Sequence, residues 1–88
     1  MKIKDGFVLK EIAGSYVVVP VGQNLVDFSS MITTNETGAF LWQELQNGAD
    51  KEELLKKTMA EYEGVSEEEV IADIDEFISS LKENNILE

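Results

Sequence analysis

The side chains that could carry chemistry in this chain are almost all carboxylates. Its 88 residues include 18 Asp and Glu and 7 Lys, with no Arg, His or Cys. Without His or Cys, the common general bases, thiol nucleophiles and soft metal ligands are missing. The carboxylates are spread along helical segments rather than gathered between strands, so a glycosidase-like pair has no support. We therefore expect neither an enzyme nor a bound cofactor.

One acidic motif, Asp73-Ile-Asp75, has the spacing of the first ligands of a calcium-binding loop. Such a loop needs glycine at its sixth position, where this sequence has Ile78. The motif also lies within a strong helical pattern. We therefore expect no metal site.

The net charge of −11 is unevenly distributed along the chain. Residues 50–88 carry 13 acids and 4 lysines, a net charge of −9, whereas residues 1–49 carry 5 acids and 3 lysines, a net charge of −2. Nucleic acids and anionic membranes are bound through Lys and Arg, so this balance opposes both as partners and permits a basic one. The N-terminus lacks the apolar core of a signal peptide, and no run is long enough to span a bilayer. We expect a cytoplasmic protein.

The first third of the sequence has the pattern of strands. Residues 7–13 alternate roughly, Gly14-Ser15 indicates a turn, and residues 16–19 form a β-branched run. Pro20 has no backbone N–H and is expected to close the second strand or to lie on an edge. Residues 26–34 predict a third strand.

From residue 35 the pattern becomes helical, and three N-cap residues mark where helices begin. Asn35 precedes the first helix, which is predicted to end at Asn47-Gly48. Asp50 and Ser66 each have a Glu three residues later, which is the capping-box pattern. The third helix is predicted to end at Asn84-Asn85, with the residues after it folding back onto the core. Its wide apolar stripe consists of Val70, Ile71, Ile74, Phe77, Ile78 and Leu81.

These elements predict one domain over residues 1–88, of the α+β class. A three-stranded antiparallel sheet is expected to be followed by three helices, and no repeat or linker divides the chain.

The segment Met31-Ile-Thr-Thr-Asn-Glu-Thr-Gly-Ala-Phe-Leu-Trp42, the short turn at Gly48 and the acidic, capped third helix resemble the PqqD family. This family, also called the RiPP recognition element, has a winged-helix-like fold of three strands and three helices. One departure is Thr34, because the family usually has leucine before the asparagine. The resemblance implies a peptide chaperone, which binds the leader of a ribosomally made precursor peptide and delivers it to a modifying enzyme, often a radical SAM enzyme.

The resemblance also implies where the leader binds, namely as an added strand on the open edge of the third strand, beside the third helix. An unpaired edge offers backbone N–H and C=O groups to such a strand. On the strand, the expected contact residues are Asp27, Phe28, Ser29, Met31, Ile32 and Thr33. On the helix, they are Ile71, Ile74 and Ile78 for apolar contact and Asp75 for a basic side chain of the leader. The alternative for the isoleucines is ordinary core, and for Asp75 it is a solvated acid.

A second hypothesis is a winged-helix domain that binds nucleic acid or serves only as a scaffold for dimerisation. The sequence leaves the oligomeric state open between monomer and homodimer, because an edge that accepts a peptide also accepts a second copy. It does not name the precursor, the modifying enzyme or the final product.

Overall fold

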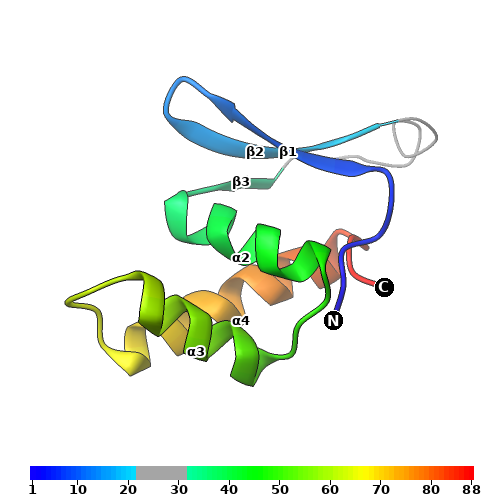
Figure 1. The fold of residues 1–88 in the computed structure, drawn as a ribbon. Helices are drawn as coiled ribbons and strands as arrows, with labels where there is room; N and C mark the ends of the chain where they lie inside the picture. Colours follow the sequence, from blue (N-terminus) through cyan, green and yellow to red (C-terminus); the bar gives the residue numbers. More distant parts are fainter. Residues whose placement is uncertain (22–31) are drawn as a thin grey trace.

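A computed structural model describes residues 1–21 and 32–88 and has the predicted element order (Figure 1). A three-stranded antiparallel sheet is followed by three helices, which confirms the α+β fold class. The part of the predicted third strand before residue 32 lies outside the described residues. The elements are β1 (Phe7–Ile12), β2 (Ser15–Pro20), β3 (Ile32–Thr34), α2 (Glu36–Gln46), α3 (Lys51–Glu61) and α4 (Glu67–Glu83).

Strands β1 and β2 form a hairpin whose turn lies one residue earlier than the sequence predicted. Ile12 pairs with Ser15, so the turn consists of Ala13 and Gly14. Both have positive φ, 51° and 82°, as a type I′ turn requires. This turn matches the twist of the two strands, and β2 ends at Pro20 as expected.

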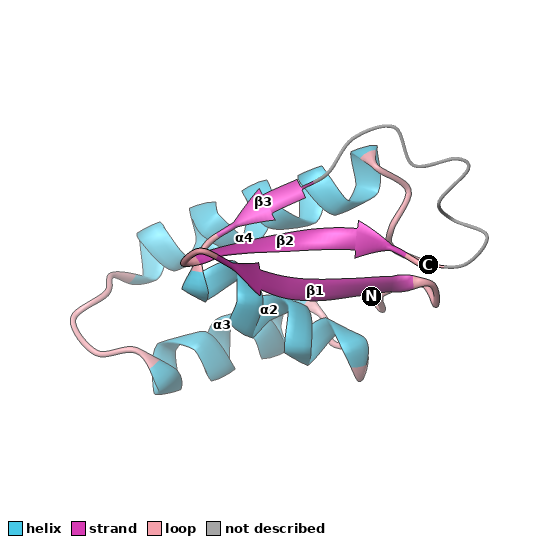
Figure 2. Ribbon diagram, turned by 90° about the horizontal axis from the view of Figure 1, so that it is seen from above, coloured by secondary structure: helices cyan, strands magenta, loops and turns pink. Residues whose placement is uncertain are grey.

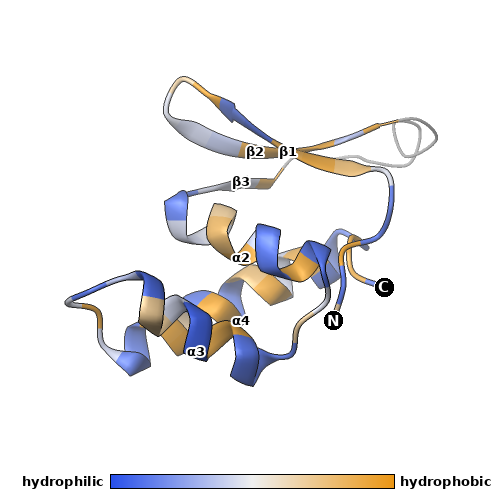
Figure 3. Cartoon of the chain, in the orientation of Figure 1, coloured by the Kyte–Doolittle hydropathy of each residue, from blue (hydrophilic) through white to orange (hydrophobic). Residues whose placement is uncertain are grey.

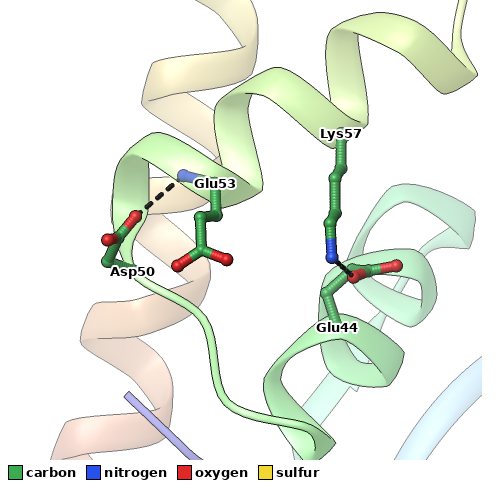
Figure 4. Close-up of polar contacts among 4 residues, drawn as sticks. All are labelled: Glu44, Asp50, Glu53 and Lys57. Carbon is green, nitrogen blue, oxygen red and sulfur yellow. Dashed lines mark hydrogen bonds and ion pairs between the residues drawn. The ribbon is translucent and has the colours of Figure 1, made fainter.

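The three predicted N-caps are confirmed, each by a side-chain oxygen that accepts a hydrogen bond from a backbone N–H three residues later. Asn35 Oδ1 accepts from Gly38 at 2.9 Å, and Ser66 Oγ accepts from Glu69 at 3.2 Å. Asp50 Oδ1 accepts from Glu53 at 2.8 Å (Figure 4). Each bond satisfies a donor that the first turn of a helix would otherwise leave unpaired.

The end of α4 has the geometry of a Schellman motif with asparagine in place of glycine. Asn85 has a φ of 58° and donates its N–H to Lys82 O, while Ile86 donates to Leu81 O at 2.9 Å. Ile86 is fully buried, which confirms that the chain turns back onto the core.

The first residues of the chain lie between the α2–α3 connection and the chain's last residues. Met1 exchanges two backbone hydrogen bonds with Ala49, and Ile3 forms a β-bridge with Leu87. Glu88 N–H donates to Lys2 O at 2.9 Å. The two ends of the chain therefore lie close together, as Figure 1 shows.

The hydrophobic core lies between the sheet and the helices, where the apolar positions of each element meet (Figure 3). Trp42 of α2 is its largest fully buried side chain, and Leu41 and Leu45 of the same helix are also fully buried. Val18 is the fully buried residue that the sheet contributes. The core face of α4 consists of Val70, Ile74, Phe77, Ile78 and Leu81.

None of the helices in the described part of the chain is long and apolar enough to cross a membrane.

A buried hydroxyl in α3 gives a first prediction. Thr58 is 0% exposed, and its Oγ1 has no hydrogen-bond partner among the described residues. Since an unpaired buried hydroxyl is costly, Thr58→Val should raise the free energy of unfolding by about 1 kcal/mol. Chemical denaturation measures the change. The matched variant Thr58→Ser keeps the hydroxyl and removes the methyl group, so it should lower stability, and a loss of stability in Thr58→Val would contradict the prediction.

Candidate functional site

Strand β3 is an outer strand of the sheet, because the strand order is β1-β2-β3. On the side away from β2, no other described strand pairs with it. Figure 2 shows this free side running beside α4, whereas β1 lies at the opposite edge of the sheet. The sheet therefore has an open edge next to the longest helix.

The hairpin turn fixes which backbone groups of β2 are directed toward β3. In a hairpin with a two-residue turn, the residues that flank the turn exchange both backbone hydrogen bonds, and here these are Ile12 and Ser15. Strand residues then alternate, so Tyr16 and Val18 direct their N–H and C=O groups away from β1. These two residues supply the bonds to β3.

The same alternation leaves one residue of β3 with outward-directed backbone groups. Tyr16 pairs with Thr34 and Val18 pairs with Ile32, so both ends of β3 are bonded to β2. Thr33, between them, directs its N–H and C=O to the free edge. A strand added at this edge would therefore be bonded through Thr33.

A cavity of about 320 Å³ lies beside this edge, between β3, the first turns of α2, and α4. Its apolar surface comes from Ile32, Leu41 and Phe77, while hydroxyl, amide and carboxylate groups supply the rest. The lining residues are Ile32, Thr33, Thr34, Asn35, Thr37, Gly38, Leu41, Asp73, Glu76, Phe77 and Ser80. We call this cavity the groove.

One flank of α4 forms the wall of the groove. Glu76 and Phe77 lie three and four residues after Asp73, and Ser80 lies four and three residues after them, so the four residues share a face of the helix. Phe77 belongs both to the groove lining and to the core, because it lies where this flank meets the buried stripe. The groove is thus a direct continuation of the core surface.

The groove is negatively charged, and none of its described lining residues is basic. Within the described part of the chain, the ion pairs join Lys51 to Asp75 and Lys57 to Glu44, each at 2.8 Å (Figure 4 shows the second). Residues 22–31 also contain no Lys or Arg. Among the described residues, the carboxylates of Asp73 and Glu76 therefore have no ion-pair partner.

The Lys57–Glu44 pair connects α3 to α2 away from the groove. The hydrogen bond that Lys57 Nζ donates to Glu44 Oε2, together with the negative charge of Glu44, raises the pKa of Lys57. Both ion pairs lie on the surface, and the Lys51–Asp75 pair is the more exposed of the two. We therefore expect little stabilisation from either pair.

The end of β3 approaches the first turn of α2 so closely that only glycine fits at position 38. A Cβ on Gly38 would lie 2.8 Å from Thr34 Cβ and 2.9 Å from Thr34 Cγ2. Thr34 is the position at which the sequence departs from the family pattern. Its side chain lies directly against Gly38.

The predicted strand residues divide between the groove and the undescribed segment. Ile32 and Thr33 line the groove. The predictions for Asp27, Phe28, Ser29 and Met31 fall outside the described residues.

The predicted residues of α4 do not line the groove. Ile74 and Ile78 are 2% and 3% exposed, so the core alternative holds for them. Asp75 forms the ion pair with Lys51 of α3, and Ile71 is 42% exposed. Ile71, Asp75 and Ile78 follow each other at steps of four and three residues, so they share the flank that faces α3 rather than the sheet.

Sequence reasoning missed Asp73, Glu76, Phe77 and Ser80 as groove residues. The apolar stripe of α4 identifies its buried face, and the residues on either side of a stripe are then candidates for a groove. The sequence does not indicate which flank faces the sheet, because both carry acids. Within the described chain, no group of three acidic side chains lies close enough together to hold a metal ion.

The family model described as "Coenzyme PQQ synthesis protein D (PqqD)" matches residues 15–87. The chain belongs to the PqqD family. This confirms the resemblance carried by the strand–Asn35–helix segment, and the match includes every described strand and helix except β1.

A solved structure has the same fold as this PqqD-family chain. It is "TbiB1 in Complex with the TbiA(beta) Leader Peptide", with a TM-score of 0.73 and 27% sequence identity. The match covers 100% of this chain and 95% of that one. A search of curated proteins finds no match.

The contact between β3 and α2 gives the second prediction. Gly38→Ala should lower the free energy of unfolding by about 1–3 kcal/mol, because the added methyl group cannot fit against Thr34. Thermal or chemical denaturation measures the loss.

A double-mutant cycle with Thr34→Gly provides the control. Removing the Thr34 side chain makes room for the methyl group. The double variant should therefore lose less free energy of unfolding than the sum of the losses in the two single variants. Strictly additive losses would show that Gly38 is required for another reason.

Proposed function

We propose that this protein is an accessory peptide-binding protein. In this proposal it binds the leader of a ribosomally synthesised precursor peptide as an added strand on β3 and presents it to a peptide-modifying enzyme. The observation that carries the proposal is the outward-directed backbone of Thr33 beside a groove on α4. Family membership and the similarity to a protein solved with a leader peptide support it.

Strand addition uses the edge and the groove for different purposes. The backbone groups of Thr33 would bond the leader without regard to its sequence, which supplies affinity. Alternate side chains of the added strand would point toward α4 and contact the apolar surface of Ile32, Leu41 and Phe77. On the sequence pattern alone, we propose that Asp27, Phe28, Ser29 and Met31 extend the receiving edge.

The charge of the groove selects among leaders. Asp73 and Glu76 lie on the wall opposite the edge, and neither forms an ion pair with a lysine in the described part of the chain. A leader that places Lys or Arg beside its apolar anchor would supply the missing charge, whereas an acidic side chain there would be repelled.

The partner that receives the peptide is proposed to be the enzyme that modifies it, in many members of the family a radical SAM enzyme. We propose that the protein contributes binding rather than catalysis, as one domain over residues 1–88, in the cytoplasm where precursor peptides are made. The nucleic-acid alternative is not favoured, because a groove that carries carboxylates repels phosphate.

The third prediction concerns the outward N–H of Thr33. Thr33→Pro removes this donor and leaves the bonds of Ile32 and Thr34 to β2 in place. The affinity for the leader should fall about tenfold or more, since one carbonyl of the bound peptide then lacks its donor. Fluorescence anisotropy with a labelled leader peptide measures the affinity.

The matched control is Thr33→Ala, which loses the same side chain but keeps the N–H. It should bind within about twofold of the wild type, because the side chain contributes no backbone bond. Equal affinities of the proline and alanine variants, both folded by circular dichroism, would rule out strand addition at this residue.

The fourth prediction concerns the charge of the groove. The double variant Asp73→Asn/Glu76→Gln should bind a leader carrying Lys or Arg about two- to tenfold more weakly, with a smaller dependence on salt. The control Asp75→Asn/Glu83→Gln makes the same change of net charge outside the groove lining. Equal weakening by the two double variants would mean that overall charge, and not the groove, attracts the leader.

A further inference from the structure

A second hollow, of about 390 Å³, lies on the other side of α2 from the groove. It is bordered by the hairpin end of the sheet, α2 and the C-terminal end of α3. Figure 1 shows the hairpin end of the sheet above the start of α2. The lining residues are Leu9, Glu11, Tyr16, Glu36, Ala39, Phe40, Gln43, Glu61 and Tyr62.

Aromatic side chains form the surface of this hollow. Phe40 and Tyr62 pack edge to face, with ring centroids 5.9 Å apart and an interplanar angle of 80°. Tyr16 contributes from β2, and all three rings are only partly buried. The three partly exposed rings are grouped in one concave surface rather than scattered singly over the protein. Aromatic rings attract cations to their faces.

Carboxylates surround the rings, and no basic side chain is among the described residues that line the hollow. Glu11 lies opposite Tyr16 in the hairpin register, Glu36 comes from the first turn of α2, and Glu61 comes from the last turn of α3. None of the three forms an ion pair with a lysine in the described part of the chain. The pKa of Tyr62 is raised, first by burial and then by the charges of Glu36 and Glu61, in agreement with a negative field over the ring.

Helix α2 separates the hollow from the groove. Thr37, Gly38 and Leu41 line the groove, whereas Ala39 and Phe40 line the hollow. None of the described residues lines both cavities. Occupation of one therefore leaves the other accessible.

We propose that this hollow is a docking surface for a protein partner that inserts an arginine or lysine side chain between the rings and the carboxylates. The charge complementarity favours this occupant over an acidic or purely apolar one, because an apolar side chain would bury carboxylates without a partner. The partner binds while the groove holds its peptide. That this partner is the peptide-modifying enzyme rests on the proposed function. The binding of a basic side chain in the hollow is independent of the proposed function.

The test uses a short blocked peptide containing two arginines as the probe, and the same peptide with citrulline as the uncharged control. NMR titration of the full chain should shift the aromatic signals of Tyr16, Phe40 and Tyr62 with the arginine peptide only. Phe40→Leu should weaken the binding about threefold, because the cation–π contact is lost.

A matched pair of charge variants separates a site from general attraction to an acidic protein. Glu11→Gln/Glu36→Gln/Glu61→Gln should weaken binding of the arginine peptide about tenfold. Glu52→Gln/Glu68→Gln/Glu83→Gln changes the net charge equally away from the hollow and should leave binding within about twofold. Equal weakening in both variants, or shifts confined to the groove residues, would overturn the proposal.

The same variants distinguish this inference from the proposed function. The hollow variant should bind a leader peptide as tightly as the wild type while its affinity for the modifying enzyme falls. A loss of leader affinity in the hollow variant, with its affinity for the enzyme unchanged, would overturn the proposal of a docking surface. Strand addition at β3 is tested separately, by the Thr33→Pro variant.

Discussion

The arrangement of this protein depends on a single residue, Asn35, that joins β3 to α2. Its side chain caps the helix by accepting from Gly38 N–H, and its backbone carbonyl accepts from Ala39 N–H at 2.9 Å. Because the strand ends where the helix begins, the helix axis is fixed relative to the sheet. The contact of Thr34 with Gly38 tightens the same junction. The position of the groove between β3 and α4 follows from this geometry.

Helix α2 has two functions that follow from its central position. Its buried residues Leu41, Trp42 and Leu45 anchor it in the core, and its two flanks contribute to different cavities. Both cavities contain carboxylates that form no ion pair with a lysine among the described residues. An acidic protein gains little stability from such charges, since unpaired like charges repel each other. Their arrangement around concave, partly apolar surfaces is instead suited to basic ligands.

The sequence predicted those features that depend on local interactions. Each N-cap residue acts within one helical turn, so Asn35, Asp50 and Ser66 were recognisable from their spacing alone. The hairpin was also recognisable, but its turn was placed one residue late. A type I′ turn at Ala13-Gly14 places alanine at positive φ, which alanine does not favour, so no local signal marked it.

The candidate site was predicted only in part, because it depends on how elements pack. The residues that β3 contributes could be inferred, because the free edge of an outer strand does not depend on which helices cover the sheet. Ile32 and Thr33 line the groove. The helix side could not be inferred from periodicity. Periodicity identifies the buried stripe of α4, but the choice between the flank of Asp73 and the flank of Asp75 is decided by where α3 packs.

The most direct test of the account is the exchange rate of backbone amide hydrogens in β3, measured by NMR with and without a bound leader peptide. Strand addition predicts that Thr33 N–H, which faces the open edge, becomes strongly protected when the leader binds. Ile32 and Thr34, already bonded to β2, should change little. A leader that binds tightly while Thr33 N–H exchanges as fast as in the free protein would contradict the account.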